Sequence, residues 1–164
     1  ITAGGKGALR LKDKGGSGPY TGKLPSSISP TFSLVLRPTI PAPAKNAVSV
    51  GIKAKKAAVV VGAPKLHLSY KGTSKNKKVR VLAQLVDPKT GLVLGNQITP
   101  FALKLNGKRH TQDVAMEDVS FALRKGQRLQ LQIVANSGAY KTFPKGGRVT
   151  FSKVRIGLPV VSSS

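Results

Sequence analysis

Short runs of alternating apolar and polar residues, each ended by a turn, constrain the fold of this 164-residue chain more than any other feature. Successive side chains of a β-strand point to opposite faces, so such runs are typical of strands with one buried face. No segment keeps a 3.6-residue apolar period over three turns, as a long amphipathic helix would. Many short strands spaced roughly 8–12 residues apart predict an all-β sandwich or jelly roll.

Ten stretches match the strand pattern, and turn signals separate nearly all of them. They are residues 31–37, 47–52, 57–61, 66–70, 79–87, 92–94, 97–103, 114–123, 129–134 and 149–158. The continuous apolar run at 57–61 predicts a strand buried on both faces. Lys71-Gly72 predicts a turn, and Asp87-Pro88-Lys89-Thr90-Gly91 predicts a hairpin connection in which the Asp87 side chain caps the turn.

Composition divides the chain into three parts. Residues 1–30 are rich in Gly, Pro, Ser and Lys and predict a flexible basic N-terminal arm or linker, with a short strand favoured only at 8–11. Their two glycine-rich runs, at 4–7 and 15–18, are interpreted as linker rather than phosphate-binding loops, since neither joins a strand to a helix. We expect the β-sandwich domain at 31–161, with an extended, proline-rich connection at 38–46, and a tail at 162–164.

What the composition lacks excludes several kinds of site. The chain has no cysteine, which excludes disulfides, cysteine–zinc sites and thiol catalysis. The chain contains no run of about 18 apolar residues, the length that predicts a membrane span. The chain begins without Met and without the apolar core of a signal peptide, so we expect a fragment or a processed product.

Positive charge is the dominant global property. Twenty-eight Lys and Arg oppose five Asp and Glu, a formal net charge of +23, and the bases are spread along the whole chain. A field of this size attracts polyanions. The densest basic run, residues 71–80, is predicted to be a solvated loop between two strands. The candidate polyanion-binding residues are Lys71, Lys75, Lys77, Lys78, Arg80, Lys108, Arg109, Lys141 and Lys145.

The kind of anion is constrained by the aromatic residues. There is no Trp, and most of the Phe residues stand in strand-like runs where a core position is favoured. Stacking platforms for bases are therefore missing, and we expect non-specific nucleic-acid binding at most. Tyr140 is the candidate contact for a ligand such as a sugar, although a structural role is favoured for it.

Candidate catalytic groups are few. His67 and His110 have no carboxylate at a sequence spacing that indicates a proton relay, and no G-x-S-x-G motif occurs. Both histidines are predicted to be ordinary surface residues. Asp113, Glu117 and Asp118 are expected to pair with nearby lysines. We therefore predict no catalytic residue, no metal site and no cofactor.

A family resemblance covers residues 57–161. It rests on four landmarks in order: VGAP at 61–64, LHLSYKG at 66–72, VRVLAQLVDPKTGLVLGNQITP at 79–100 and FALRKGQRLQLQI at 121–133. This stretch resembles the C-terminal, non-catalytic domain of the X-Pro dipeptidyl-peptidase and cocaine-esterase-like serine hydrolases. The resemblance implies a galactose-binding-like jelly roll that packs on a catalytic α/β-hydrolase domain, and a secreted or cell-envelope location. The family's catalytic Ser, Asp and His belong to that other domain, so none is carried over.

Three functions remain open from the sequence. The first is a non-catalytic accessory β-sandwich that packs on, or shapes the site of, a serine hydrolase domain. The second is a cationic module that binds anionic polymers or surfaces, such as cell wall, lipid headgroups or nucleic acid. The third is a self-assembling structural jelly roll. Binding that survives physiological salt would distinguish a built anion site from generic attraction, since exposed charges are screened over about 8 Å there.

Overall fold

β-Strands make up most of the chain that the structure describes. The computed structural model describes residues 1–16, 44–137 and 146–161. Its strands are β1 (Thr2–Arg10), β2 (Ala47–Lys53), β3 (Ala58–Gly62), β4 (Lys65–Val86), β5 (Thr99–Ala115), β6 (Val119–Leu123), β7 (Arg128–Val134), β8 (Arg148–Gly157) and β9 (Val160–Val161). One short 3-10 turn, η1 (Leu94–Asn96), precedes β5. No helix within these ranges has the length and apolar character needed to cross a membrane.

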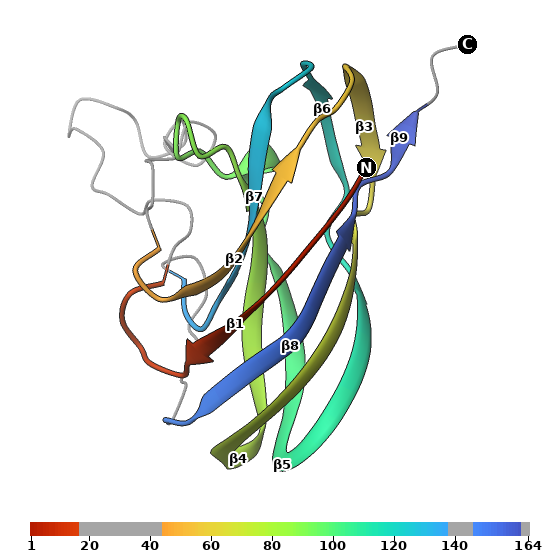
Figure 1. The fold of residues 1–164 in the computed structure, drawn as a ribbon. Coiled ribbons are helices and arrows are strands. Elements are labelled where there is room, and N and C mark those ends of the chain that lie inside the picture. Colours follow the sequence, from red (N-terminus) through yellow and green to blue (C-terminus); the bar gives the residue numbers. More distant parts are fainter. Residues whose placement is uncertain (17–43, 138–145, 162–164) are drawn as a thin grey trace, which may run out of the picture.

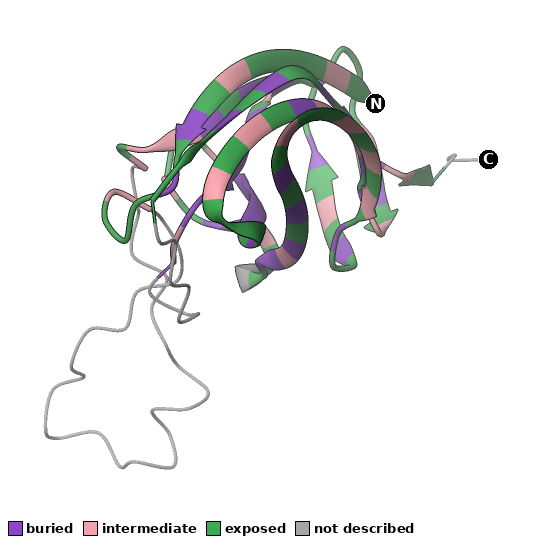
Figure 2. Ribbon diagram, turned by 90° about the horizontal axis from the view of Figure 1, so that it is seen from below, coloured by how far each residue is buried: buried purple, intermediate pink, exposed green. Residues whose placement is uncertain are grey.

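One antiparallel sheet, bent on itself, dominates the fold. Its strand order is β1-β8-β4-β7-β2, with β5 paired along β4. The first half of β4 lies between β5 and β8, and its second half between β5 and β7. The register of β4 with β5 is interrupted twice between Lys71 and Lys78, and such irregularities let strands bend and pass from one layer to the other. Figures 1 and 2 show the resulting arch of the long strands.

The two halves of this sheet pack face to face through β1 and β2. A Cβ atom at Gly5 would lie 2.9 Å from Val50 Cγ2, and one at Gly7 would lie 3.0 Å from Val48 Cγ1. Glycine in a strand often marks a place where a neighbouring element approaches closely. The valines of β2 occupy the space that the two glycines leave, which brings the layers together.

The core lies between the two halves. Inward side chains of β4 and β8 alternate with exposed ones, and Leu68, Val154 and Phe151 are at most 1% exposed. Leu131 and Ile133 of β7 meet them from the opposite layer. Each such residue contributes about 1.5–3 kcal/mol by leaving water.

A second, three-stranded sheet has the order β6-β3-β9. Val60 of β3 is fully buried, whereas its neighbours Val59 and Val61 are 49% and 48% exposed. The prediction that this run is buried on both faces is therefore wrong: the small sheet packs one face on the core and leaves the other uncovered.

The predicted fold class is confirmed: the molecule is an all-β sandwich of jelly-roll type. The predicted strands at 47–52, 129–134 and 149–158 correspond to β2, β7 and β8. The Asp87 turn is also confirmed, because Asp87 Oδ1 accepts a hydrogen bond from the Lys89 amide at 2.8 Å and the Asp87 carbonyl accepts one from the Gly91 amide at 2.7 Å.

Several strand predictions are wrong. Residues 71–80 are not a loop, and Lys71-Gly72 is not a turn, because both lie inside the 22-residue strand β4. The predicted strand at 114–123 is broken at 116–118 into the end of β5 and β6. The predicted strand at 92–94 is reduced to one bridge between Val86 and Val93, followed by η1.

The predicted flexible arm also differs from the structure at its start. Residues 2–10 form β1, which pairs along β8 from Thr2 with Gly157 to Arg10 with Arg148. Backbone pairing with β8 holds these residues although they carry few apolar side chains. The rest of the predicted arm from residue 17, the predicted strand at 31–37 and the tail at 162–164 lie outside the described residues, so the division into domains stays a prediction.

Candidate polyanion-binding surface

The candidate basic residues divide between one sheet face and the bend beside it. Lys71 and Arg109 are directly opposite each other on β4 and β5. Lys75 and Lys77 lie in the bend, within the second register break between Thr73 and Lys78, and Lys108 follows Gly107 on the β5 side. All five side chains are exposed. Candidates Tyr140, Lys141 and Lys145 lie outside the described residues.

Beyond the bend, Lys78 is directly opposite Lys104, and Arg80 is opposite Ala102. These residues belong to the second half of the sheet, on the outer side of the sandwich, where Lys78, Arg80 and Lys104 are exposed. The candidates therefore form no single pocket. They follow the outside of the β4–β5 hairpin around the bend.

Directly opposed like charges recur across the described strands. The pairs are Arg10 with Arg148, Lys53 with Arg128, Lys71 with Arg109, and Lys78 with Lys104. Like charges directly opposite each other in a sheet are destabilising. Between described residues, no Lys or Arg forms an ion pair with a carboxylate. The positive charges of the described Lys and Arg side chains are thus not neutralised by carboxylates on the surface.

The outward side chains of one half of the large sheet form the basic face, a term kept below for this surface. It comprises strands β1, β8, the first half of β4 and the second half of β5. The exposed cations on it are Lys6, Arg10, Lys65, Lys71, Arg109, Arg148, Lys153 and Arg155. Only Lys71 and Arg109 were candidates from the sequence. Some of the others could have been found from the sequence, because Arg148, Lys153 and Arg155 alternate with buried residues along β8.

A histidine–carboxylate pair lies in one row of the basic face. His67 is opposite Asp113 on β5 and Arg155 on β8. The His67 Nδ1 atom lies 2.7 Å from Asp113 Oδ1, and the two side chains are 40% and 81% exposed. Asp113 thus pairs with a histidine, and the expectation that it pairs with a lysine is wrong. The sequence spacing of the histidines gave no sign of this partner, because Asp113 is 46 residues from His67 and only the pairing of β4 with β5 brings them together.

The other candidate groups have ordinary surroundings. His110 Nε2 lies 2.8 Å from Asn106 Oδ1, and its ring centroid is 5.7 Å from that of Tyr70. Glu117 and Asp118 are exposed in the connection between β5 and β6. No group of three His, Cys, Asp or Glu side chains able to hold a metal converges within the ranges that the structure describes.

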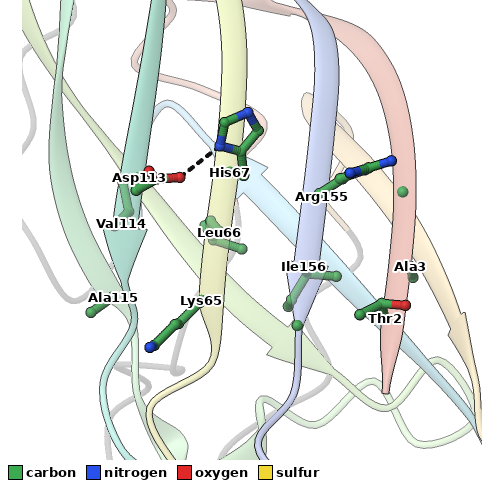
Figure 3. A pocket seen from close by; sticks show the side chains of 12 residues that line it. Thr2, Ala3, Lys65, Leu66, His67, Asp113, Val114, Ala115, Arg155 and Ile156 are labelled. Carbon is green, nitrogen blue, oxygen red and sulfur yellow. Dashed lines mark hydrogen bonds and ion pairs between the residues drawn. The ribbon is translucent and has the colours of Figure 1, made fainter.

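An open hollow of about 1010 Å³ lies over the His67 row. Figure 3 shows Asp113 directed toward His67, Arg155 extended toward β1, and Lys65 and Thr2 near the end of the sheet. The backbone of Gly4 lies beside Arg155, whose Cγ would be 3.7 Å from a Cβ at that position. The hollow therefore joins two cationic side chains, an imidazole, a carboxylate and a hydroxyl, and its lining also includes Leu66, Val114 and Ile156.

A relay needs a nucleophile as well as this pair. In a Ser-His-Asp triad the carboxylate bonds Nδ1 and the nucleophile bonds Nε2. His67 and Asp113 match the first contact, yet no hydroxyl of the described residues is hydrogen bonded to His67. The geometry instead suits binding: the pair fixes the imidazole, and the carboxylate, imidazole and guanidinium all face the hollow.

Comparison with known proteins shows the fold. No protein-family model and no curated protein matches the sequence. Among solved structures, an α-amino acid ester hydrolase superposes with a TM-score of 0.61 at 13% identity, over 96% of this chain and 33% of its own. An aminopeptidase from a marine sediment Thaumarchaeota archaeon gives 0.61 at 11% identity, over 96% and 33%. A CocE/NonD family hydrolase from Staphylococcus aureus gives 0.54 at 13% identity, over 72% and 31%.

This chain thus spans about one third of each of these hydrolases. At such low identity the likeness establishes a shared β-sandwich fold. The resemblance noted from the sequence points to the same class of protein, and no described residue of this chain completes a catalytic triad. Nearly the whole chain is similar in fold to one part of larger hydrolases.

Proposed function

We propose that this chain is a non-catalytic accessory β-sandwich of a serine hydrolase, packed against a catalytic α/β-hydrolase domain and shaping the mouth of its active site. The observation that carries the proposal is coverage: 96% of this chain superposes on one third of an ester hydrolase and of an aminopeptidase. The ordered sequence landmarks between residues 61 and 133 support the same assignment. We also propose the secreted or cell-envelope location that the resemblance implies.

The docking surface we assign to the catalytic domain is the uncovered side of the small sheet. Val59 and Val61 of β3 and Val161 of β9 are 48–51% exposed, and Val59 is directly opposite Val161. We call these three residues the valine patch. Contiguous exposed apolar groups mark interaction sites more often than isolated ones do. This chain covers only one third of the similar hydrolases, and a domain corresponding to their other two thirds is the partner that we assign to the valine patch.

The first test is enzymatic. The purified chain is assayed with p-nitrophenyl acetate and with amino-acid p-nitroanilides, and we expect no turnover above the uncatalysed rate. Hydrolysis that disappears in a His67→Ala variant would overturn the non-catalytic assignment, because His67 with Asp113 is the one histidine–carboxylate pair among the described residues.

The second test concerns the partner. The coding sequence around this chain is read for an α/β-hydrolase region with a G-x-S-x-G elbow. That region is then expressed alone, and this chain is added in trans. We expect association and at least a tenfold gain in kcat/KM. Absence of such a region, or a fully active region without this chain, would contradict the proposal.

A matched pair of variants locates the contact. Val59→Ser combined with Val161→Ser is expected to weaken association at least tenfold, since it removes apolar surface from the patch. Leu92→Ser is the control, because Leu92 is 37% exposed but lies outside the small sheet. Equal effects of both variants would show that the valine patch is not the docking surface. A discrete homo-oligomer in light scattering, without a hydrolase partner, would favour the self-assembling alternative.

A further inference from the structure

We propose that the basic face binds a linear, carboxylated polysaccharide, with one acidic sugar held in the hollow at His67, Asp113 and Arg155. This site is independent of the valine patch and of the accessory role proposed above. It rests on four properties of the face: its net charge, its share of arginine, its lack of aromatic and apolar side chains, and the position of its one carboxylate.

The charge of the face is strongly one-sided. Its eight exposed cations, from Lys6 to Arg155, are accompanied by a single carboxylate, Asp113, which is bonded to His67. Two of its cation pairs, Lys71 with Arg109 and Arg10 with Arg148, are directly opposed across neighbouring strands. Such pairs repel each other in the free protein. An anionic group lying between the two cations of a pair removes that repulsion, so the face is stabilised by an acidic ligand.

The face is richer in arginine than the chain as a whole. Four of its eight cations are Arg, whereas the chain has eight Arg among 28 basic residues. A guanidinium binds a carboxylate through two parallel hydrogen bonds, which an ammonium does not. Ser69, Thr111 and Thr150 share the rows of Lys153 and Lys71. Their hydroxyls are suited to the neutral hydroxyl groups of a sugar chain.

The side chains that other partners require are missing from this face. Tyr70 and Phe151 belong to its strands but point into the core, at 2% and 1% exposure, so the described face offers no ring for stacking a base. The exposed large apolar residues of the described chain, such as Val59 and Leu92, lie elsewhere. The face therefore lacks the apolar centre of a protein interface and the apolar anchors of a membrane-surface site.

The carboxylate distinguishes a sugar from a phosphate backbone. Asp113 and Arg155 line the hollow on opposite sides of His67, with Lys65 near the end of the sheet and Arg155 extended toward β1. A carboxylate repels a phosphodiester and a sugar carboxylate alike, but it accepts hydrogen bonds from the hydroxyls of a sugar ring, which a DNA backbone does not offer. Arg155 then contacts the acidic group of the same sugar, and Thr2, on the same side of the hollow, contacts a further hydroxyl. Lys65, on the other side, is left for the acidic group of a neighbouring sugar. The outward positions of β4 on this face are 65, 67, 69, 71 and 73, and each begins a row that runs across the paired strands. At roughly 3.4 Å per residue the five rows extend over about 27 Å, which leaves room for several sugars.

The test is isothermal titration calorimetry of the full chain with polygalacturonate at 0.15 M NaCl. Dextran is the neutral control, a 20-base-pair DNA duplex represents nucleic acid, and phosphatidylglycerol vesicles represent membranes. We expect saturable binding of polygalacturonate, weaker binding of the duplex and vesicles, and none of dextran. Loss of all polygalacturonate binding at this salt concentration would overturn the proposal, as would tighter binding of the duplex or vesicles.

Two double variants separate the face from the general field. Lys71→Gln with Arg109→Gln removes an opposed pair from the face. Lys53→Gln with Arg128→Gln removes a pair that is also exposed and directly opposed, at the edge of the other half of the sheet. We expect at least a tenfold rise in Kd for the first and less than a twofold rise for the second. Equal rises would show that only net charge matters and would refute the site.

A single substitution tests the hollow by the sign of its effect. Asp113→Asn raises the net charge of the protein, so any generic polyanion binding becomes tighter. If Asp113 accepts sugar hydroxyls, the variant instead binds polygalacturonate at least threefold more weakly, while the duplex binds slightly more tightly. Tighter binding of both ligands would overturn the assignment of the hollow. None of these results bears on hydrolase association through the valine patch, so the two proposals fail separately.

Discussion

At the scale of single residues, glycine has a structural role here that composition conceals. Gly72 stands in the middle of β4, where its sequence neighbours predict a turn. A Cβ at this position would lie 2.5 Å from the Arg148 carbonyl oxygen and 2.9 Å from Val149 Cα. Both neighbours are backbone atoms of β8 and move only if the strand moves. The glycine is therefore needed for the close approach of β4 and β8 next to the bend.

Gly72→Ala is accordingly expected to destabilise the protein by about 1–3 kcal/mol, the usual cost of forcing extra volume into a packed site. Gly51→Ala is the matched control, since Gly51 lies in β2 and a Cβ there meets no atom within 4 Å. It should be neutral or stabilise by roughly 0.5 kcal/mol, because alanine costs less entropy in a strand than glycine. Urea unfolding followed by circular dichroism measures both, and equal effects would refute this role of Gly72.

At the scale of elements, the sequence predicts strands wherever one face is apolar and misses those where it is not. Residues 72–78 contain no buried side chain, so no alternation identifies them, and backbone pairing alone makes them part of β4. Most of β1 is missed for the same reason, since its glycines pack against side chains from β2, and only its end overlaps the short strand predicted at 8–11. The alternation of apolar and polar residues indicates which side chains are buried. It does not reveal strands such as these, which are held by backbone pairing with segments that are distant in sequence.

The His67–Asp113 pair shows why the candidate site was only partly predictable. Continuing the register in which Lys78 faces Lys104 without a break would place Ala115 opposite His67. The irregularities between Lys71 and Lys78 shift the pairing so that Asp113 takes that place. Bulges of this kind cannot be recognised in a polar, glycine-containing stretch, because it has no apolar alternation that a change of register would interrupt. The predicted cations Lys71 and Arg109 are found together, but the carboxylate beside them could not be placed from the sequence.

The opposed cations make a prediction for the paired strands. Lys78→Glu converts the Lys78–Lys104 pair from a repulsive to an attractive one, which should raise the free energy of unfolding by about 0.5–1 kcal/mol. Lys125→Glu is the control, because Lys125 is exposed in the turn between β6 and β7 and has the same charge change. It should stabilise less, since only the general field acts on it. Chemical denaturation at 20 mM salt measures both, and a larger effect at Lys125 would contradict the pairwise explanation.

At the scale of the whole molecule, the charge opposes the compact state. A net charge of +23 on 164 residues repels itself most strongly when the chain is folded, and the described carboxylates leave the Lys and Arg residues unpaired. The screening length falls from about 30 Å at 0.01 M salt to about 10 Å at 0.1 M. Added salt should therefore relieve repulsion both within the opposed pairs and between the more distant rows of the basic face.

We expect the melting temperature to rise by about 3–6 °C between 10 and 200 mM NaCl, equivalent to about 1–2 kcal/mol for a domain of this size. Sucrose at equal osmolality controls for effects unrelated to charge, and differential scanning calorimetry provides the measurement. The rise should shrink in a variant that combines Lys78→Glu with Lys53→Glu, because each change removes an opposed pair. A melting temperature that stays flat or falls with NaCl would mean that the cations are already neutralised within the fold, which would remove the physical basis for an acidic ligand on the basic face.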